Sequence, residues 1–181
     1  MRSMLLALLF VTVVSGGASA GGIQTLHVAS DVRLAFSPHG EGTKLVVSAI
    51  EGAKREILVQ AYSFTSTDIA KALGKAKERG VDVRVILDKT NATVRGGRRQ
   101  YSGATYLKDH GIPVWNDDTV KIAHNKVMVM DGRGVVTGSF NFTKAAEISN
   151  AENVLYIEDA PALAKAYADN WAARLRVSRP Y

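Results

Sequence analysis

Apolar residues along the chain follow two alternating spacings, one typical of strands and one typical of amphipathic helices. At 81–88 apolar and polar residues alternate, which predicts a β-strand, whereas at 44–55 apolar residues recur at helical spacing. Ser66 and its neighbours offer N-cap side chains for a further helix, and Gly80 is suitably placed to end it. The pattern predicts strands at 24–36, 56–64, 81–88, 112–115, 122–130, 135–142 and 152–159, and helices at 44–55, 65–80, 161–177 and, in a shorter form, before residue 111.

This succession of strands and helices favours an α/β fold, in which helices pack on a mixed β-sheet. The segment 56–64 is a nearly continuous apolar run, as expected of a buried strand. The segment 90–100, "TNATVRGGRRQ", breaks the pattern as a basic loop. No repeat of solenoid length is visible.

The N-terminus has the pattern of an export signal. Arg2 precedes an apolar run at 4–14, and Ala18 and Ala20 have the spacing of a signal-peptidase site. The run is shorter than the roughly 20 residues that a membrane-spanning helix needs. We therefore expect residues 1–20 to be a cleaved signal peptide and the protein to be periplasmic or secreted, with an uncleaved interfacial anchor as the alternative.

The remaining residues, 21–181, suit a single domain, because domains commonly contain about 100 to 150 residues. Without Arg2 this part has 22 basic and 17 acidic side chains and a net charge of +5, which favours polyanionic partners. The chain has no cysteine, which excludes disulfides, thiolate chemistry and cysteine-based zinc sites.

Two of the predicted strands, 122–130 and 135–142, carry a concentration of polar side chains. A tight turn, "DGRG", joins them. Because strand side chains alternate, we expect His124 and Lys126 to share one side of their strand and Ser139 and Asn141 to share one side of the partner. If these sides coincide, four groups that suit a phosphate converge. A lone histidine on a strand is usually a packed or surface residue, but four residue types at fixed offsets favour a functional interpretation.

The spacing of these residues resembles the HKD motif of the phospholipase D superfamily. His124 and Lys126 are followed by Asp131 and then by Gly138, Ser139 and Asn141. The segments "AYSFTSTDIAKAL", "KERGVDVRVILD" and "GSFNFTKAAE" resemble the small secreted endonucleases of that superfamily, and the similarity extends through residues 21–181. The resemblance implies an α-β-α sandwich with a largely buried mixed sheet.

The resemblance also implies a metal-independent mechanism without cofactors, through a phosphohistidine. His124 would be the nucleophile, because a neutral imidazole is nucleophilic near pH 7. Lys126 and Asn141 would stabilise charge on the phosphate oxygens, and Ser139 would add a hydrogen bond. Glu152 matches the glutamate that orients the imidazole in this family. Together with Asp131 and Gly138, to which we assign structural roles, these are the predicted motif residues.

Larger members of the superfamily carry two such motifs in one chain, and this chain carries one. A single imidazole provides a nucleophile but no acid for the leaving group. We therefore expect a homodimer in which His124 of a second copy supplies the acid, because a two-fold axis brings the same residue of both copies together.

Two further groups of charged residues have open interpretations. Arg95, Arg98 and Arg99 form either a solvated loop or contacts to substrate phosphates. Asp117 and Asp118 could suggest a metal site, since many nucleases use carboxylates and magnesium. They lie in a polar turn beside Asn116, so we predict no metal.

Three functions are compatible with these residues. The leading prediction is a sequence-tolerant endonuclease acting on DNA, with RNA as a further candidate substrate, and with no stable membrane association after signal cleavage. The second keeps the chemistry but acts on phospholipid head groups, which would call for an exposed apolar lip or an amphipathic surface helix. The third is a non-catalytic nucleic-acid-binding module, which would be expected to have lost motif residues.

Overall fold

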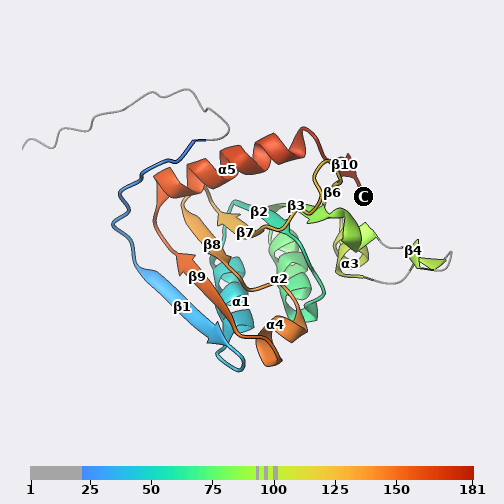
Figure 1. The fold of residues 1–181 in the computed structure, drawn as a ribbon, viewed down its shortest axis with the longest axis horizontal. Helices are drawn as coiled ribbons and strands as arrows, with labels where there is room; N and C mark the ends of the chain where they lie inside the picture. The colour runs from blue at the N-terminus through green and yellow to red at the C-terminus, as the bar shows by residue number, and fades with distance from the viewer. Residues whose placement is uncertain (1–21, 93, 96–97, 100–101) are drawn as a thin grey trace, which may run out of the picture.

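The computed structural model describes residues 22–92, 94–95, 98–99 and 102–181, and a mixed eight-stranded sheet forms its centre (Figure 1). Across this sheet the strand order is β1-β9-β8-β7-β2-β3-β6-β10. The strands are β1 (Val32–Ser37), β2 (Glu56–Ala61), β3 (Asp82–Asp88), β6 (Val114–Asp117), β7 (Lys126–Met130), β8 (Gly134–Gly138), β9 (Glu152–Ile157) and β10 (Arg179–Pro180). The predicted signal peptide, residues 1–20, lies outside the described residues.

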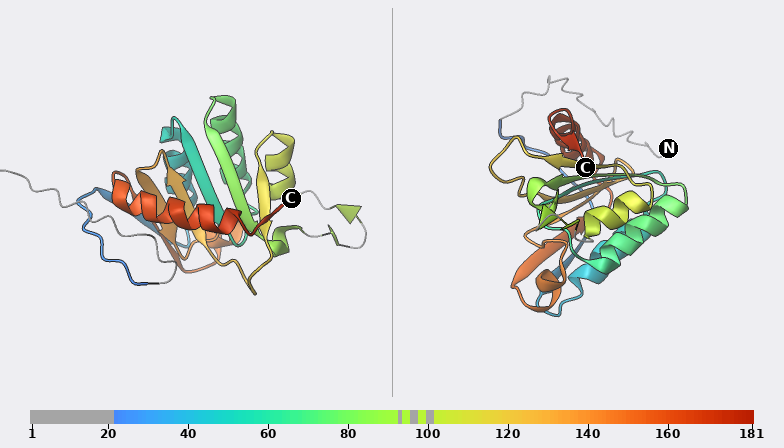
Figure 2. Two further views of the ribbon diagram at one scale, coloured as in Figure 1. Left: turned by 90° about the horizontal axis from the view of Figure 1, so that it is seen from above. Right: turned by 90° about the vertical axis from the view of Figure 1, so that its right-hand side faces the viewer.

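Helices cover both faces of the sheet, as the right-hand view of Figure 2 shows. Strands β2, β3 and β6 are parallel, and the other neighbours pair antiparallel. The helices are α1 (Gly42–Gly52), α2 (Thr67–Glu78), η1 (Lys89–Ala92), α3 (Gly103–Asp109), α4 (Lys144–Ile148) and α5 (Pro161–Leu175). This arrangement confirms the predicted α-β-α sandwich with a mixed sheet.

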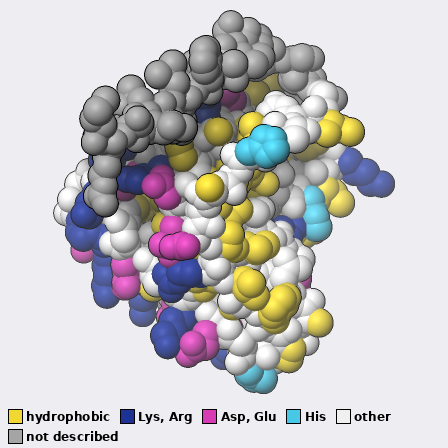
Figure 3. All heavy atoms as spheres, turned by 90° about the vertical axis from the view of Figure 1, so that its left-hand side faces the viewer, with side chains coloured by type: hydrophobic (Ala, Val, Ile, Leu, Met, Phe, Trp, Pro, Cys, Tyr) yellow, Lys and Arg dark blue, Asp and Glu magenta, His cyan; other side chains and the backbone are white. Residues whose placement is uncertain are grey.

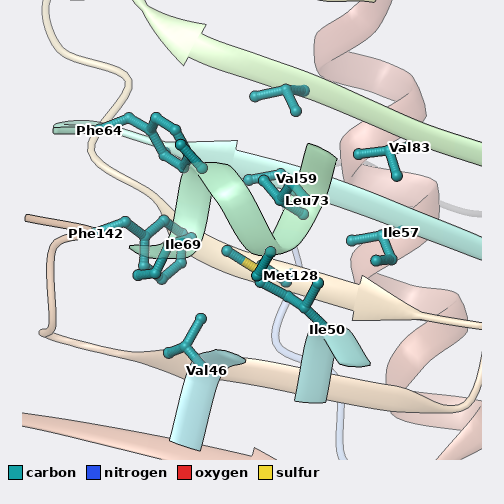
Figure 4. Close-up of a cluster of buried hydrophobic side chains, with 14 of the residues drawn as sticks. Val46, Ile50, Ile57, Val59, Phe64, Ile69, Leu73, Val83, Met128 and Phe142 are labelled. Atoms are coloured by element: carbon teal, nitrogen blue, oxygen red, sulfur yellow. The ribbon is translucent and has the colours of Figure 1, made fainter. Parts of the chain in front are cut away.

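The larger part of the core lies between the sheet and helices α1 and α2 (Figure 4). Phe64 and Phe142 are almost fully buried and meet edge to face, with ring centroids 6.3 Å apart. Full burial of such a side chain contributes about 1.5–3 kcal/mol. The two residues also form an isolated parallel bridge, so this contact fixes the segments that follow β2 and β8.

Helix α5 covers the opposite face and packs across β6, β2, β7 and β8. Trp171 is buried there, and its indole Nε1 donates to the carbonyl of Val59 at 2.9 Å. The helix leaves β1 and β9 uncovered on this face. Strand β1 is the edge of the sheet, and Val32, Leu34 and Phe36 on it are 47%, 55% and 64% exposed.

Several predicted elements differ from the structure at their ends. The predicted strand 24–36 is confined to β1, and α4 was not predicted. The basic loop 90–100 contains two short paired strands, β4 (Val94–Arg95) and β5 (Arg98–Arg99). The side chains of Arg95, Arg98 and Arg99 lie outside the described residues.

Candidate active site

The predicted catalytic residues gather at one end of the sheet, where the parallel strands β2, β3 and β6 have their carboxyl ends. Strands β7 and β9 begin at this end and β8 finishes there, because they run antiparallel to their neighbours. In open α/β sheets ligands commonly bind outside the carboxyl ends of the strands. The topology therefore brings His124, Lys126, Ser139, Asn141 and Glu152 to a common edge.

His124 is exposed and precedes β7, so the prediction that 122–130 forms one strand was wrong at its start. The chain is held there by other contacts. The backbone amide of Ala123 donates to Asp88 Oδ2 at 2.7 Å, and the amide of Tyr62 donates to the carbonyl of Asn125 at 2.9 Å. His124 thus lies in a loop that is fixed on both sides.

Lys126 is the first residue of β7 and is only 7% exposed. Its Nζ donates to the carbonyl of His124 at 2.7 Å and lies 5.2 Å from the centre of the Tyr62 ring. Burial lowers the pKa of Lys126 from its ordinary value, and the negative charge of Glu152 partly opposes this change. A buried ammonium with few partners is suited to holding an anion.

Ser139 and Glu152 form a hydrogen-bonded pair across the β8–β9 connection. The Ser139 Oγ donates to Glu152 Oε2 at 2.6 Å, and Asn150 Nδ2 donates to Glu152 Oε1 at 3.0 Å. Within the described residues, Glu152 makes no hydrogen bond to the imidazole of His124. The orienting role of Glu152 therefore stays a prediction.

Ser139 and Asn141 lie beyond β8, so the prediction that 135–142 is one strand was wrong at its end. The strand stops because Gly138 has a φ of 152° and a Cβ there would lie 2.3 Å from the carbonyl oxygen of Asn153. The amides of Ser139 and Phe140 both donate to that same oxygen. Gly138 therefore allows the backbone to leave the ladder and carry Asn141 into the site.

The side chain of Asn141 has an unsatisfied acceptor. Its Oδ1 is buried and has no hydrogen-bond partner among the described residues. Buried polar atoms are normally hydrogen-bonded, and a catalytic role is one explanation for an orphaned one. The side-chain nitrogen, Nδ2, makes no hydrogen bond among the described residues either, and it is the atom that can donate to an oxygen of a ligand.

Asp131 lies at the far end of β7, away from these groups. Its carboxylate accepts hydrogen bonds from the backbone amides of Lys54, Arg55 and Glu56 at 2.8–2.9 Å. Burial opposes its ionisation, but these hydrogen bonds and the charge of Arg55 outweigh burial and lower the pKa of Asp131. The carboxylate joins the β7–β8 turn to the start of β2.

Comparison with known proteins identifies the family. A family model described as "Cardiolipin synthase, PLD-like domain" matches residues 46–174, which include all the motif residues. This match covers well over half of the chain. The chain belongs to the phospholipase D superfamily. The resemblance drawn from the motif spacing is thereby confirmed.

Individual members of the phospholipase D superfamily are similar over most of the chain. A Rickettsia prowazekii protein named Phospholipase D is 42% identical over 149 residues, 82% of this chain and 70% of the relative. The human Mitochondrial cardiolipin hydrolase is 32% identical over 123 residues, 67% of this chain and 47% of the relative.

Among solved structures, Nuc from Salmonella typhimurium, a phospholipase D family member, matches with a TM-score of 0.76 and 41% identity. The match covers 84% of this chain and 99% of that chain. NucT from Helicobacter pylori matches with a TM-score of 0.71 at 22% identity, which supports the fold alone.

The supporting roles of two aspartates near this phospholipase D motif were missed by sequence reasoning. Asp88 ends β3, and hydrogen bonds from Thr90 and Ala123 outweigh its burial and lower its pKa. Asp117 ends β6, is 1% exposed and accepts two hydrogen bonds from Arg174 at 2.6 and 2.7 Å. The two carboxylates anchor the loop that leads to His124. For Asp88 the available signal was an aspartate that ends an apolar strand; Asn116 separates Asp117 from the predicted strand, so Asp117 carried no such signal.

Asp117 therefore has a structural partner, and Asp118 lies 3.4 Å from Arg179. In the part of the chain that the structure describes, no three histidine, cysteine, aspartate or glutamate side chains are grouped as metal ligands would be. The same part contains no helix with the length and apolarity needed to span a membrane.

Proposed function

We propose that this phospholipase D superfamily member is a metal-independent endonuclease that hydrolyses phosphodiester bonds of DNA, with RNA as a further substrate. It would act outside the cytoplasm after removal of residues 1–20. The observation that carries the proposal is the meeting of three complementary groups at one sheet end. These groups are the exposed imidazole of His124, the buried ammonium of Lys126 and the side-chain amide of Asn141, whose Nδ2 donates to no residue that the structure describes.

Each group has a distinct task in the proposed reaction. A ring nitrogen of neutral His124 attacks phosphorus, and a P–N bond forms while the P–O bond to the leaving group breaks. Lys126 and Asn141 stabilise the negative charge on the non-bridging oxygens. Water then attacks phosphorus and the P–N bond breaks, which regenerates the imidazole.

The leaving oxygen needs a proton, and the proposed donor is protonated His124 of a second copy. In the second step that imidazole, now neutral, takes a proton from the attacking water. A two-fold axis beside the site would supply it, since such an axis places the same residue of both copies close together. The active site is then shared across a homodimer.

An apolar strip beside the site supports the homodimer. It consists of Val32, Leu34 and Phe36 on β1, which point away from α1 and its side of the core, whereas Ala35 packs toward it. Phe36 pairs with Asn153, and the next residue pairs with Glu152, so the strip ends at the active site. Figure 3 views the molecule from the side of β1 and shows hydrophobic side chains gathered on this face.

This strip provides a direct test of the assembly. Phe36→Asp should convert a dimer into a monomer in sedimentation equilibrium and abolish turnover, because each site would lose its second imidazole. Ile148→Asp, which changes another exposed apolar side chain, is the matched control. A Phe36→Asp variant that stays dimeric would contradict this interface.

Nucleic acid is favoured as the substrate by charge and by similarity. Residues 21–181 carry a net charge of +5, which attracts a polyanion. The similarity to Nuc extends over nearly the whole of that chain.

The second candidate function is hydrolysis of phospholipid head groups. Two observations favour it, namely the exposed apolar strip on β1 and the names of the Rickettsia and human relatives. An apolar surface next to the site could contact a bilayer, in which case the strip would bind lipid instead of a second copy.

One experiment separates these functions. Purified residues 21–181 would be incubated in EDTA with supercoiled plasmid, with RNA, and with vesicles of phosphatidylcholine or cardiolipin. The proposal predicts nicked and linear plasmid from the wild type and none from His124→Ala. Turnover of lipid with intact plasmid would establish the second function, and plasmid cleavage that needs added magnesium would contradict the metal-independent mechanism.

A further inference from the structure

One tyrosine contacts both the nucleophile and the cation of the proposed site. The ring centroids of Tyr62 and His124 are 4.7 Å apart, with the planes tilted by 53°. Lys126 Nζ lies 5.2 Å from the centre of the same Tyr62 ring. Since that Nζ also donates to the carbonyl of His124, the three residues form a closed set of contacts.

The contacts have clear physical consequences for both groups. An aromatic face attracts a cation, so the ring compensates part of the desolvation of the buried Lys126 ammonium. A tilted aromatic neighbour restricts the rotation of the His124 side chain, which is otherwise exposed. The ring therefore fixes the imidazole relative to the ammonium.

Tyr62 is also separable from the framework of the fold. It follows β2, is half-buried and is not part of either apolar core. Its backbone hydrogen bonds, from its amide to the carbonyl of Asn125 and from Asn91 Nδ2 to its own carbonyl, do not depend on its side chain. A substitution at this position thus removes the ring and leaves the backbone hydrogen bonds in place.

We propose that Tyr62 is a positioning residue, whose ring holds the imidazole of His124 and the ammonium of Lys126 in the mutual orientation that attack on a phosphodiester requires. This inference rests on the proposed phosphodiesterase function. The ring acts through these two residues and not through contact with the nucleobase or lipid part of a substrate.

The test compares a small diester with DNA. Bis(4-nitrophenyl) phosphate presents a phosphodiester without a nucleobase, so a residue that acts through His124 and Lys126 affects both substrates alike. Misplacing reacting groups by about 1 Å can cost about 10²-fold in rate. Tyr62→Leu should lower kcat by roughly 10- to 100-fold on both substrates with KM nearly unchanged. Tyr62→Phe, which keeps the ring, should stay close to the wild type.

Two controls keep the result interpretable. Tyr106→Leu removes another tyrosine that stacks on a histidine, His110, and should leave kcat unchanged. Tyr62→Met, which fills a similar volume without an aromatic face, gives the same comparison if the leucine variant does not fold.

Wild-type kcat for folded Tyr62→Leu or Tyr62→Met on the small diester would overturn the inference, as would an increase in KM confined to DNA, which indicates base stacking. A wild-type protein that cleaves neither diester would overturn the proposed function, and the inference with it.

Discussion

Two charged residues of the motif, Lys126 and Asp131, lie at opposite ends of β7, and their environments differ. At its start, Lys126 is buried, and burial lowers its pKa. Immediately after its end, Asp131 accepts three backbone hydrogen bonds, and its pKa is lowered although burial opposes this. A carboxylate with its hydrogen-bonding capacity used by the fold is structural. A buried ammonium that lies beside an exposed imidazole and the side-chain amide of Asn141 is available for chemistry.

The largest effects on activity should come from substitutions at the Lys126 end of β7 and at Asn141. Lys126→Ala and Asn141→Ala should each lower kcat by about 10²- to 10³-fold, as expected when one group that stabilises transition-state charge is removed. DNA affinity should fall only modestly, because other phosphate contacts are retained. Single-turnover kinetics and equilibrium binding would measure the two quantities.

The matched control for this pair is Lys54→Ala at the Asp131 end of β7, because Lys54 bonds to Asp131 through its backbone amide. It should leave kcat unchanged. Normal kcat at saturation for Lys126→Ala, combined with poor binding, would reassign Lys126 to substrate docking.

A smaller effect, on stability, is expected at the Asp131 end of β7. Asp131→Asn should lower the free energy of unfolding at pH 7 by about 1–2 kcal/mol, allowing for partial exposure of the group, while kcat changes little. Urea titrations would measure the loss. A change in kcat comparable to that of Asn141→Ala would contradict the division of the motif into two ends.

The stability difference should also depend on pH. Because folding lowers the pKa of Asp131, its stabilisation is complete above the unfolded-state pKa and is lost as the pH falls through the folded-state value. Wild type and Asp131→Asn should therefore become more alike in acid. Asp159→Asn, which alters an exposed ion pair with Arg133, should show little difference at any pH.

The smallest expected effect is a shift in the alkaline limb of activity. Since burial lowers the pKa of Lys126, the ammonium should be lost, and activity should fall, at a pH below its ordinary value of 10.5. Glu152→Gln removes the charge that partly opposes this, so the limb should move to lower pH. Glu158→Gln is the control, and kcat profiles above pH 7 would measure both. If the alkaline limb does not move, Glu152 does not influence the pKa of Lys126.

Much of the fold and of the candidate site could be predicted from the sequence. The offsets from His124 to Asn141 predicted the family and, through it, the sandwich, while the alternation of strand and helix spacings predicted helices packed on a mixed sheet. These signals are local, because residue spacing within one strand or helix determines which side chains share a face.

The contacts that complete the site were not accessible in this way. Asp88 is 35 residues from Ala123, and Asp117 is 57 residues from Arg174. Periodicity reports burial and does not report which distant polar groups pair. For the same reason 122–130 and 135–142 were extended beyond β7 and β8, since alternation continues where hydrogen bonding with the neighbouring strand stops.

In the proposed shared site, one chain carries half of an active site, and subunit mixing tests this most directly. Wild type and His124→Ala would be mixed in varying ratios under conditions that exchange subunits, and plasmid cleavage in EDTA would be measured. A heterodimer has either no nucleophile or no acid, so activity should fall as the square of the wild-type fraction. A linear fall from demonstrably exchanged subunits would contradict the account, because each chain would then hold a complete site.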